Sequence, residues 1–189
     1  MPRLTTRRPW YWTQFNPASK SAGAEIAQLR KGVGQPAGSV PELWRYYAVA
    51  ISDHEAATGE MPTGLVAEHA ALTLFAVHQQ SQSTSMHRQD EHIGTALRKL
   101  RSSPQFADNP EALDRRVNAA ATATSVTELV FHLRGLITLL RGQQLPLDYT
   151  RLTKDIAAWH DPDERARARR RWGANYYTWN AAESTTHAA

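Results

Sequence analysis

The 189-residue sequence contains no cysteine, so disulfide bonds, thiolate metal sites and a cysteine nucleophile are excluded. No apolar run approaches the roughly 18 residues that a membrane-spanning helix requires. The first residues, MPRLTTRRPWYW, carry arginines but lack the apolar stretch of a secretory signal. These absences predict a cytoplasmic protein that is free of membranes. Its length is sufficient for a hydrophobic core without metal or disulfide crosslinks.

Lysine is also scarce, because 18 of the 22 basic residues are arginine and only 4 are lysine. The formal net charge is +4 and the isoelectric point is about 9.6. Arginine binds phosphate through two parallel N–H groups and stacks on bases, so an arginine-rich positive surface favours nucleic acid. A GC-rich genome, whose codons favour arginine and alanine, explains the same composition without any nucleic acid. Composition alone leaves both interpretations open.

Turn-forming residues divide the chain into segments in which apolar residues recur every three or four positions. This pattern predicts an all-α fold, a two-lobed helical bundle of about eight or nine helices. The expected helices span residues 18–31, 40–57, 63–80, 90–101, 111–122, 126–141, 148–159 and 163–181. The loop SSPQFADNP separates an N-terminal lobe, residues 10–103, from a C-terminal lobe, residues 104–182. Residues 1–9 and 183–189 are expected to be flexible tails.

Residue patterns typical of enzymes and metal sites are weak or missing. The best histidine cluster is HRQDEH, with His87, Glu91 and His92, and it lacks the two-histidine spacing of HExxH. The glycines of KGVGQPAG miss the GxGxxG spacing by one residue and follow a helix rather than a strand, and no GxSxG occurs. We therefore expect no catalytic residue, metal, cofactor or small-molecule substrate. A metal hydrolase using the HRQDEH cluster stays a third hypothesis, for which metal in the purified protein is the test.

Segment 126–141 has one apolar face bordered by arginines. At 100° per residue its apolar side chains cover an arc of about 120°. They are Val126, Leu129, Val130, Leu133, Leu136, Ile137 and Leu140. Arg134 and Arg141 lie just beyond one edge of this arc, in a line along the helix. In segment 90–101, Arg101 borders the apolar arc in the same way and Arg98 lies farther from it.

Basic residues outnumber acidic ones between residues 92 and 141. The basic residues are Arg98, Lys99, Arg101, Arg115, Arg116, Arg134 and Arg141, and the acidic ones are Asp108, Glu111, Asp114 and Glu128. If these cations align in the fold, they form a basic track that holds phosphates without reading bases. Alternatively, each arginine lays its aliphatic stem on the core and keeps its charge in water, with no ligand.

Two further patterns favour structural roles. Aromatic residues recur at helical spacing, which predicts packing of helix on helix rather than a surface for stacking bases. They are Trp44, Tyr46, Tyr47, Trp159, Trp172, Tyr176 and Tyr177. The run ERARARRR at 164–171 spreads its arginines around a helix next to carboxylates, and we interpret it first as a solvated face.

Six stretches of the sequence occur in a characteristic order. They are LRKG (29–32), HAALTLFAVHQQ (69–80), GTALRKL (94–100), HLRGLITLLR (132–141), PLDYTRLTKDIAAW (146–159) and RWGANYY (171–177). In this order they resemble the CasB family, the small subunit of the type I-E CRISPR surveillance complex called Cascade. The resemblance covers about residues 10–180. Each stretch is weak alone, and their order is what makes the set specific.

The resemblance implies an all-helical, two-lobed protein without catalytic activity or metal, present as two copies in the complex. The implied partners are crRNA, target DNA, the subunits CasA, CasC, CasD and CasE, and a second copy of the chain. The implied role is to stabilise the R-loop in antiviral defence by holding the displaced non-target strand and bracing the crRNA–target heteroduplex. Protein contacts can decide this step, because the exchange of strands is nearly balanced in base-pairing energy.

The resemblance also implies residues that bind nucleic acid. Basic positions of the family match Arg30 and Lys31, Arg115 and Arg116, and Arg134. Some relatives carry an arginine directly after the glycine of GTALRKL, where this chain has Thr95. We infer that Arg98, Lys99 or Arg101 supplies that charge instead. The full expected set is Arg30, Lys31, Arg98, Lys99, Arg101, Arg115, Arg116, Arg134 and Arg141. The alternative function is a purely structural helical adaptor whose basic face contacts other subunits and not DNA.

Overall fold

The computed structural model describes residues 6–177, which form helices joined by loops and contain no strand. The helices are α1 (Tyr11–Gln14), α2 (Ala22–Arg30), the 3₁₀ helix η1 (Pro41–Tyr46), α3 (Asp53–Thr58), α4 (Thr63–Gln79), α5 (Ile93–Arg101), α6 (Pro110–Thr122), α7 (Val126–Gly142), α8 (Tyr149–Ala158) and α9 (Pro162–Tyr177). Two isolated backbone bridges join Thr6 to Val49 and His87 to Leu147. The all-α prediction is confirmed.

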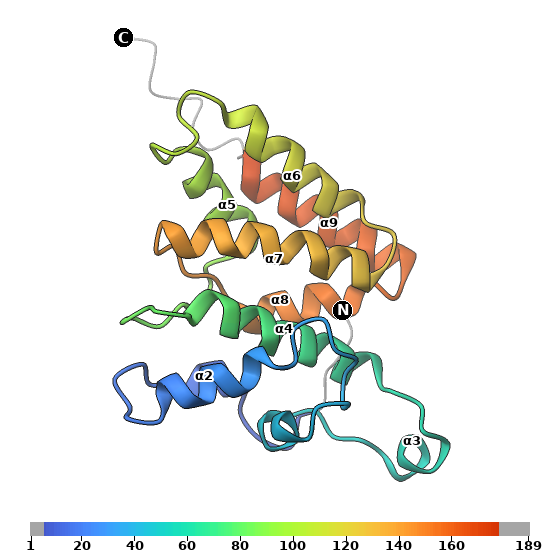
Figure 1. The fold of residues 1–189 in the computed structure, drawn as a ribbon. Coiled ribbons are helices and arrows are strands. Elements are labelled where there is room, and N and C mark those ends of the chain that lie inside the picture. Colours follow the sequence, from blue (N-terminus) through green and yellow to red (C-terminus); the bar gives the residue numbers. More distant parts are fainter. Residues whose placement is uncertain (1–5, 178–189) are drawn as a thin grey trace.

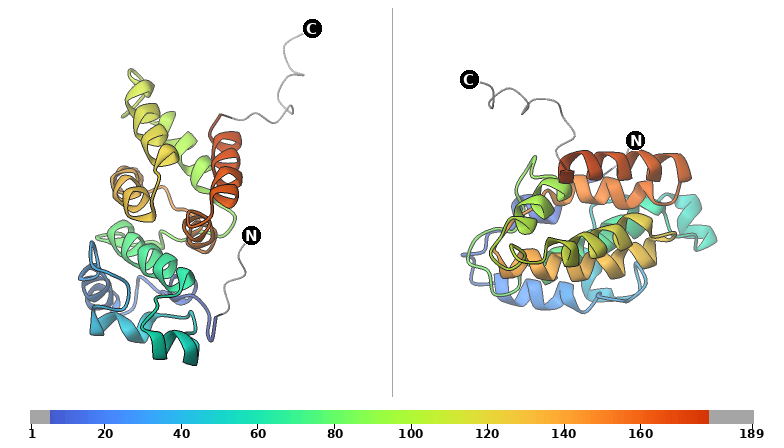
Figure 2. Two further views of the ribbon diagram at one scale, coloured as in Figure 1. Left: turned by 90° about the vertical axis from the view of Figure 1, so that its right-hand side faces the viewer. Right: turned by 90° about the horizontal axis from the view of Figure 1, so that it is seen from above.

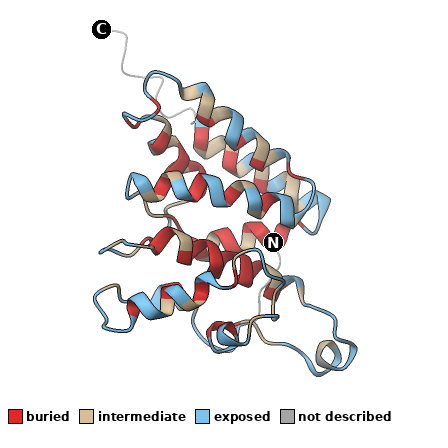
Figure 3. Ribbon diagram, viewed as in Figure 1, coloured by how far each residue is buried: buried red, intermediate tan, exposed pale blue. Residues whose placement is uncertain are grey.

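Helix α4 lies in the middle of the molecule, with α2 on one side and α7 and α8 on the other (Figure 1). Most of its length is buried (Figure 3), and the side chains of Leu72 and Phe75 are fully enclosed. Helix α6 packs along α7, and α9 packs on α5 and α8 (Figures 1 and 2). One cluster of buried hydrophobic residues includes members of every helix from α4 to α9.

The contact between α5 and α9 is unusually close at Gly94. A Cβ atom at this position would lie 2.6 Å from the carbonyl oxygen of Trp172, so only glycine fits. Helix α5 belongs to the predicted N-terminal lobe, whereas α9 belongs to the predicted C-terminal lobe. Helix packing therefore crosses the expected boundary after residue 103, and the division into lobes stays a prediction.

Local signals in the sequence start the helices of the second half. The side chains of Asn109, Ser125 and Asp148 each accept a hydrogen bond from a backbone N–H three residues later. Such caps satisfy backbone donors that have no partner within the helix. Pro110 occupies the first turn of α6, where the missing N–H costs nothing. Only the loop 123–125 separates α6 from α7, so the two helices form a hairpin.

The prediction of a single helix over residues 40–57 is wrong. The chain forms η1, then an extended stretch, and then the short α3. In the extended stretch the backbone N–H groups of Ala48 and Val49 donate to the carboxylate of Glu68, at 2.6 and 2.8 Å. These bonds satisfy the backbone groups that a continuous helix would pair locally. The partner lies 19 or 20 residues away on α4, where a local pattern cannot reveal it.

Residues 6–9, expected within a flexible tail, pack on this extended stretch. The backbone N–H of Arg7 donates to the carbonyl oxygen of Ala48 at 2.8 Å, and Nε of Arg8 donates to that of Tyr47 at 3.0 Å. The folded part of the chain therefore begins before Trp10.

The other expected helices are confirmed, with ends that differ by up to four residues. The helix expected over 163–181 is observed as Pro162–Tyr177. Residues 1–5 and 178–189, which include the end of that expected helix and the expected tail 183–189, lie outside the described residues. Among residues 6–177, no helix is long and apolar enough to cross a membrane.

Candidate functional site

A groove of about 610 Å³ lies between α6 and α7, and we call it the α6–α7 groove. Ala112, Arg115, Arg116 and Ala119 line it from α6, and Phe131, His132, Arg134, Gly135 and Leu136 line it from α7. The two helices pack side by side in all views (Figures 1 and 2). Small residues, namely Ala112, Ala119 and Gly135, leave the space between the larger side chains open.

The three arginines of the α6–α7 groove have no side-chain partner in the described part of the chain. Arg115, Arg116 and Arg134 are exposed, and within residues 6–177 their side chains make no hydrogen bond or ion pair. No carboxylate of the described residues lines the groove. Three positive charges that no nearby acid neutralises create a positive potential in a concave surface. The geometry therefore suits an anionic ligand.

Two lysines of the expected set have acidic partners. Nζ of Lys31 lies 2.7 Å from a carboxylate oxygen of Glu42, and Nζ of Lys99 lies 2.6 Å from one of Glu91. The hydrogen bond from Lys31 holds the pKa of Glu42 below its ordinary value. Neither lysine lines the α6–α7 groove.

Arg101 on α5 belongs to a hydrogen-bonded cluster that joins three helices. Its Nε and Nη2 donate to the two carboxylate oxygens of Asp114 on α6, at 2.9 and 3.1 Å. The hydroxyl of Tyr176 on α9 donates to the same carboxylate at 2.6 Å. The hydrogen bond from Arg101 is the main reason that the pKa of Asp114 lies below its ordinary value. A bidentate pair of this kind fixes an arginine in place, and here it ties α5 to α6.

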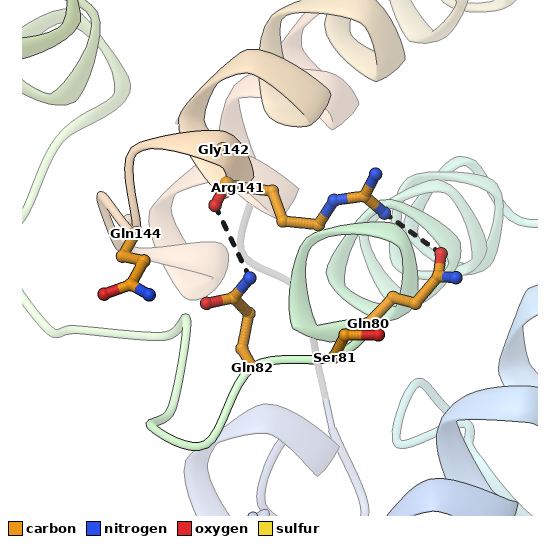
Figure 4. Close-up of a pocket in the computed structure, with 6 residues that line it drawn as sticks. All are labelled: Gln80, Ser81, Gln82, Arg141, Gly142 and Gln144. Atoms are coloured by element: carbon orange, nitrogen blue, oxygen red, sulfur yellow. Dashed lines mark hydrogen bonds between the residues drawn. The ribbon is translucent and has the colours of Figure 1, made fainter.

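Arg141 reaches across to the end of α4 (Figure 4). Its Nη1 donates to the carbonyl oxygen of Val77 at 3.1 Å and to Oε1 of Gln80 at 3.0 Å. A cation near the C-terminal end of a helix also interacts favourably with the helix dipole. Arg134 and Arg141 thus border the same apolar face, but Arg134 faces the α6–α7 groove whereas Arg141 faces α4. The expected role of Arg141 as a phosphate contact stays a prediction.

The last two expected residues lie elsewhere. Arg30 at the end of α2 is exposed and Arg98 on α5 is partly exposed. Neither lines the α6–α7 groove. Of the nine expected residues, the fold therefore brings Arg115, Arg116 and Arg134 together.

A second hollow, of about 500 Å³, lies on the other side of α7, next to α4 and the loop after α2. It is mostly apolar, with Val33, Val66, Val77 and Val130 in its lining. Phe131 and Arg134 border both this hollow and the α6–α7 groove, so the exposed face of α7 is a ridge between them.

Sequence reasoning missed Phe131. Its side chain is 66% exposed, and it lies on the ridge beside the groove arginines. The available signal was its position, because a large apolar residue outside the apolar arc of segment 126–141 has no core to enter.

Two side chains of the HRQDEH cluster have partners within the protein. Nδ1 of His87 accepts a hydrogen bond from the backbone N–H of Tyr149 at 3.2 Å, and Glu91 pairs with Lys99. Within residues 6–177, no group of three or more histidine, aspartate or glutamate side chains is arranged to hold a metal ion.

The protein is thus a small all-α protein whose surface carries an arginine-lined groove. The model of the family described as "CRISPR-associated protein Cse2" matches residues 25–177. The chain belongs to this family, and the resemblance to CasB proteins is thereby confirmed.

Solved structures of CasB proteins are similar to this one. CasB from Thermobifida fusca is 30% identical, with a TM-score of 0.65 over 84% of this chain and 86% of that one. CasB from Thermus thermophilus is 21% identical, with a TM-score of 0.62 over 88% and 94% of the two chains. CasB from M. ruber is 17% identical, with a TM-score of 0.63 over 88% and 90%. The last two show likeness of fold alone. Among curated proteins, none matches the chain.

Proposed function

We propose that this chain is the non-catalytic small subunit of a crRNA-guided type I-E Cascade complex, and that its α6–α7 groove binds the phosphate backbone of DNA. Membership of the family supports a role in a CRISPR complex. The proposed partners are crRNA, target DNA, CasA, CasC, CasD, CasE and a second copy of the chain. The proposed ligand of the groove is the displaced non-target strand of the R-loop.

The observation that carries this proposal is the contrast among the arginines. Arg101 has a bidentate carboxylate partner, as expected of a structural arginine. Arg115, Arg116 and Arg134 have no partner within the described residues and share one open groove. Like charges held together in this way repel one another, and a polyanion relieves the repulsion.

Such a groove stabilises an R-loop without reading sequence. Guanidinium groups bind phosphate oxygens, which are the same for every base. Replacing a DNA duplex by an RNA–DNA heteroduplex is nearly balanced in energy, so contacts to the displaced strand shift the equilibrium toward the open state. The guide RNA supplies the specificity, and the small subunit supplies charge.

The test replaces the three groove arginines together by alanine. We expect the variant Arg115→Ala/Arg116→Ala/Arg134→Ala to bind single-stranded DNA at least tenfold more weakly. The slope of log affinity against log salt should decrease in magnitude by about 2, because about 0.7 counterions are released per phosphate contact on a single strand. Fluorescence anisotropy with a labelled oligonucleotide at several salt concentrations measures both.

The matched control is Lys20→Ala/Arg88→Ala/Arg170→Ala, which removes the same charge. These three residues are exposed, have no side-chain partner in the described structure and do not line the α6–α7 groove. We expect the control to retain most of the affinity. Equal losses in the two triple variants would show that net charge alone drives binding, and no loss in the first would refute the groove proposal.

Crosslinking within an assembled R-loop complex separates this function from the adaptor hypothesis. A photoreactive group on the displaced strand should crosslink to α6 or α7 in the wild-type chain and not in the groove variant. Crosslinks to other subunits alone would support the adaptor.

A further inference from the structure

Phe131 is exposed to an extent that is unusual for a large apolar side chain. Its 66% exposure exceeds that of any other large hydrophobic residue among residues 6–177. Isolated exposed apolar residues are common on protein surfaces and need no explanation. Phe131, however, lies in the lining of the α6–α7 groove together with the three unpartnered arginines.

The surroundings of Phe131 leave space beside its ring. The ring of His132 contacts it edge-on, with centroids 5.4 Å apart and planes inclined by 75°. Gly135 follows one helical turn later on the same face of α7. A Cβ atom at Gly135 would meet nothing within 4 Å, so the surface there is open. The groove therefore presents an aromatic ring next to a free space, in a lining that also contains Arg115, Arg116 and Arg134.

The other strongly exposed aromatic residue differs. Trp44 is 60% exposed, but its Nε1 donates to the carbonyl oxygen of Gly38 at 2.7 Å. It lines neither the α6–α7 groove nor the apolar hollow on the other side of α7. Exposure of Trp44 thus accompanies a structural hydrogen bond, and exposure of Phe131 accompanies a cationic groove.

We propose that Phe131 stacks on an unpaired base of the DNA strand held in the α6–α7 groove. This inference rests on the proposed function, because the arginines must first hold the backbone. Proteins that bind single strands without sequence preference combine cations for the phosphates with aromatic rings for the bases. In a duplex the bases already stack on one another and their faces are covered. The ring therefore makes the groove selective for single strands, which phosphate contacts alone do not.

The test uses two variants of Phe131 and two ligands. Phe131→Leu keeps an apolar side chain and removes the flat ring, whereas Phe131→Tyr keeps the ring. The ligands are a single strand of thymidine nucleotides and an abasic deoxyribose-phosphate strand of equal length. We expect Phe131→Leu to bind the thymidine strand about tenfold more weakly than the wild type, within the range measured for base–aromatic stacking. The same variant should bind the abasic strand with unchanged affinity, and Phe131→Tyr should bind both strands like the wild type.

Several outcomes would overturn the stacking proposal. One is that Phe131→Leu binds the thymidine strand as tightly as the wild type does. Another is that Phe131→Leu loses the same affinity for the thymidine strand and for the abasic strand. A salt dependence that changes in Phe131→Leu would also count against it, because a neutral ring releases no counterions. If Phe131→Leu contradicts the stacking proposal but the triple arginine variant still binds DNA more weakly, the proposed phosphate-binding groove stands. Failure of the arginine variant to lose binding refutes the groove itself.

A crosslinking experiment provides an independent readout. A strand containing 5-iododeoxyuridine forms a covalent bond with a stacked aromatic side chain on irradiation. Mass spectrometry of the wild-type complex should locate the crosslink at Phe131. Crosslinks confined to other elements would place the bases outside the groove and overturn the proposal.

Discussion

Helices α4 and α7 are both 17 residues long, and they occupy opposite environments. Fourteen residues of α4 are buried, against five of α7. Helix α4 has other helices on several sides, whereas α7 has the core on one face and an exposed surface on the other (Figure 3). Each helix contains glutamate, histidine and phenylalanine, so the same residue types can be compared in the two environments. Position in the fold, rather than residue type, decides what these residues do.

The two glutamates show the difference most clearly. Glu68 of α4 is fully buried and accepts the backbone N–H groups of Ala48 and Val49. Burial raises its pKa above the ordinary value. Glu128 of α7 lies at an exposed helix start and accepts the N–H of Thr124 at 2.8 Å. That hydrogen bond lowers its pKa.

The largest expected effect is the difference in stability between removing the phenylalanine of α4 and removing that of α7. Phe75 of α4 is fully buried and packs edge-on against Tyr149, with centroids 5.2 Å apart. Phe75→Ala should lower the free energy of unfolding by about 3–5 kcal/mol. Phe131→Ala on α7 should change it by less than about 0.5 kcal/mol, because that ring is exposed. Urea unfolding followed by circular dichroism measures both. Similar losses in the two variants would contradict the assigned difference in burial.

The next largest effect is a pH dependence that originates in α4. Burial lowers the pKa of His78 from its ordinary 6.5 to about 3. As pH falls below about 6.5 the unfolded chain takes up a proton that the folded chain does not accept until about pH 3. The free energy of unfolding should therefore decrease on acidification in this window, by up to about 1.4 kcal/mol per pH unit.

The variant His78→Gln removes this proton and should flatten the slope of stability against pH. Urea unfolding at several pH values between 4 and 7 measures the slope. Burial also lowers the pKa of His69, so part of the dependence should remain. An unchanged slope in the variant would mean that His78 is not protected from protonation in the fold.

The smallest effect separates the two arginines at the edge of α7. Arg141→Ala removes hydrogen bonds to Val77 and Gln80 and should cost about 1 kcal/mol of stability, with little change in DNA affinity. Arg134→Ala should show the reverse, because its guanidinium group has no partner in the described structure. Thermal unfolding and anisotropy on the same samples compare them. Weaker DNA binding by Arg141→Ala without loss of stability would make Arg141 a phosphate contact after all.

Local sequence patterns predicted most helices of this chain, because caps such as Asn109, Ser125 and Asp148 and the apolar period act over one or two turns. They failed over 40–57, where the backbone is held by Glu68 from another part of the chain. The candidate site was also predicted only in part from local patterns. Arg115, Arg116 and Arg134 were expected as cations, but nothing local shows that Asp114 pairs with Arg101 and leaves these three unpaired.

An all-α, arginine-rich chain without cysteine, and the ordered stretches that mark its family, can be recognised without any coordinates. Those properties depend on composition and on contacts between neighbours along the chain. The folded arrangement was needed to show which cations pair with carboxylates, which share a groove, and that Phe131 lines that groove with them. The reason is physical, since charge pairing and solvent exposure depend on distances in space, and α6 and α7 set those distances only when they pack together.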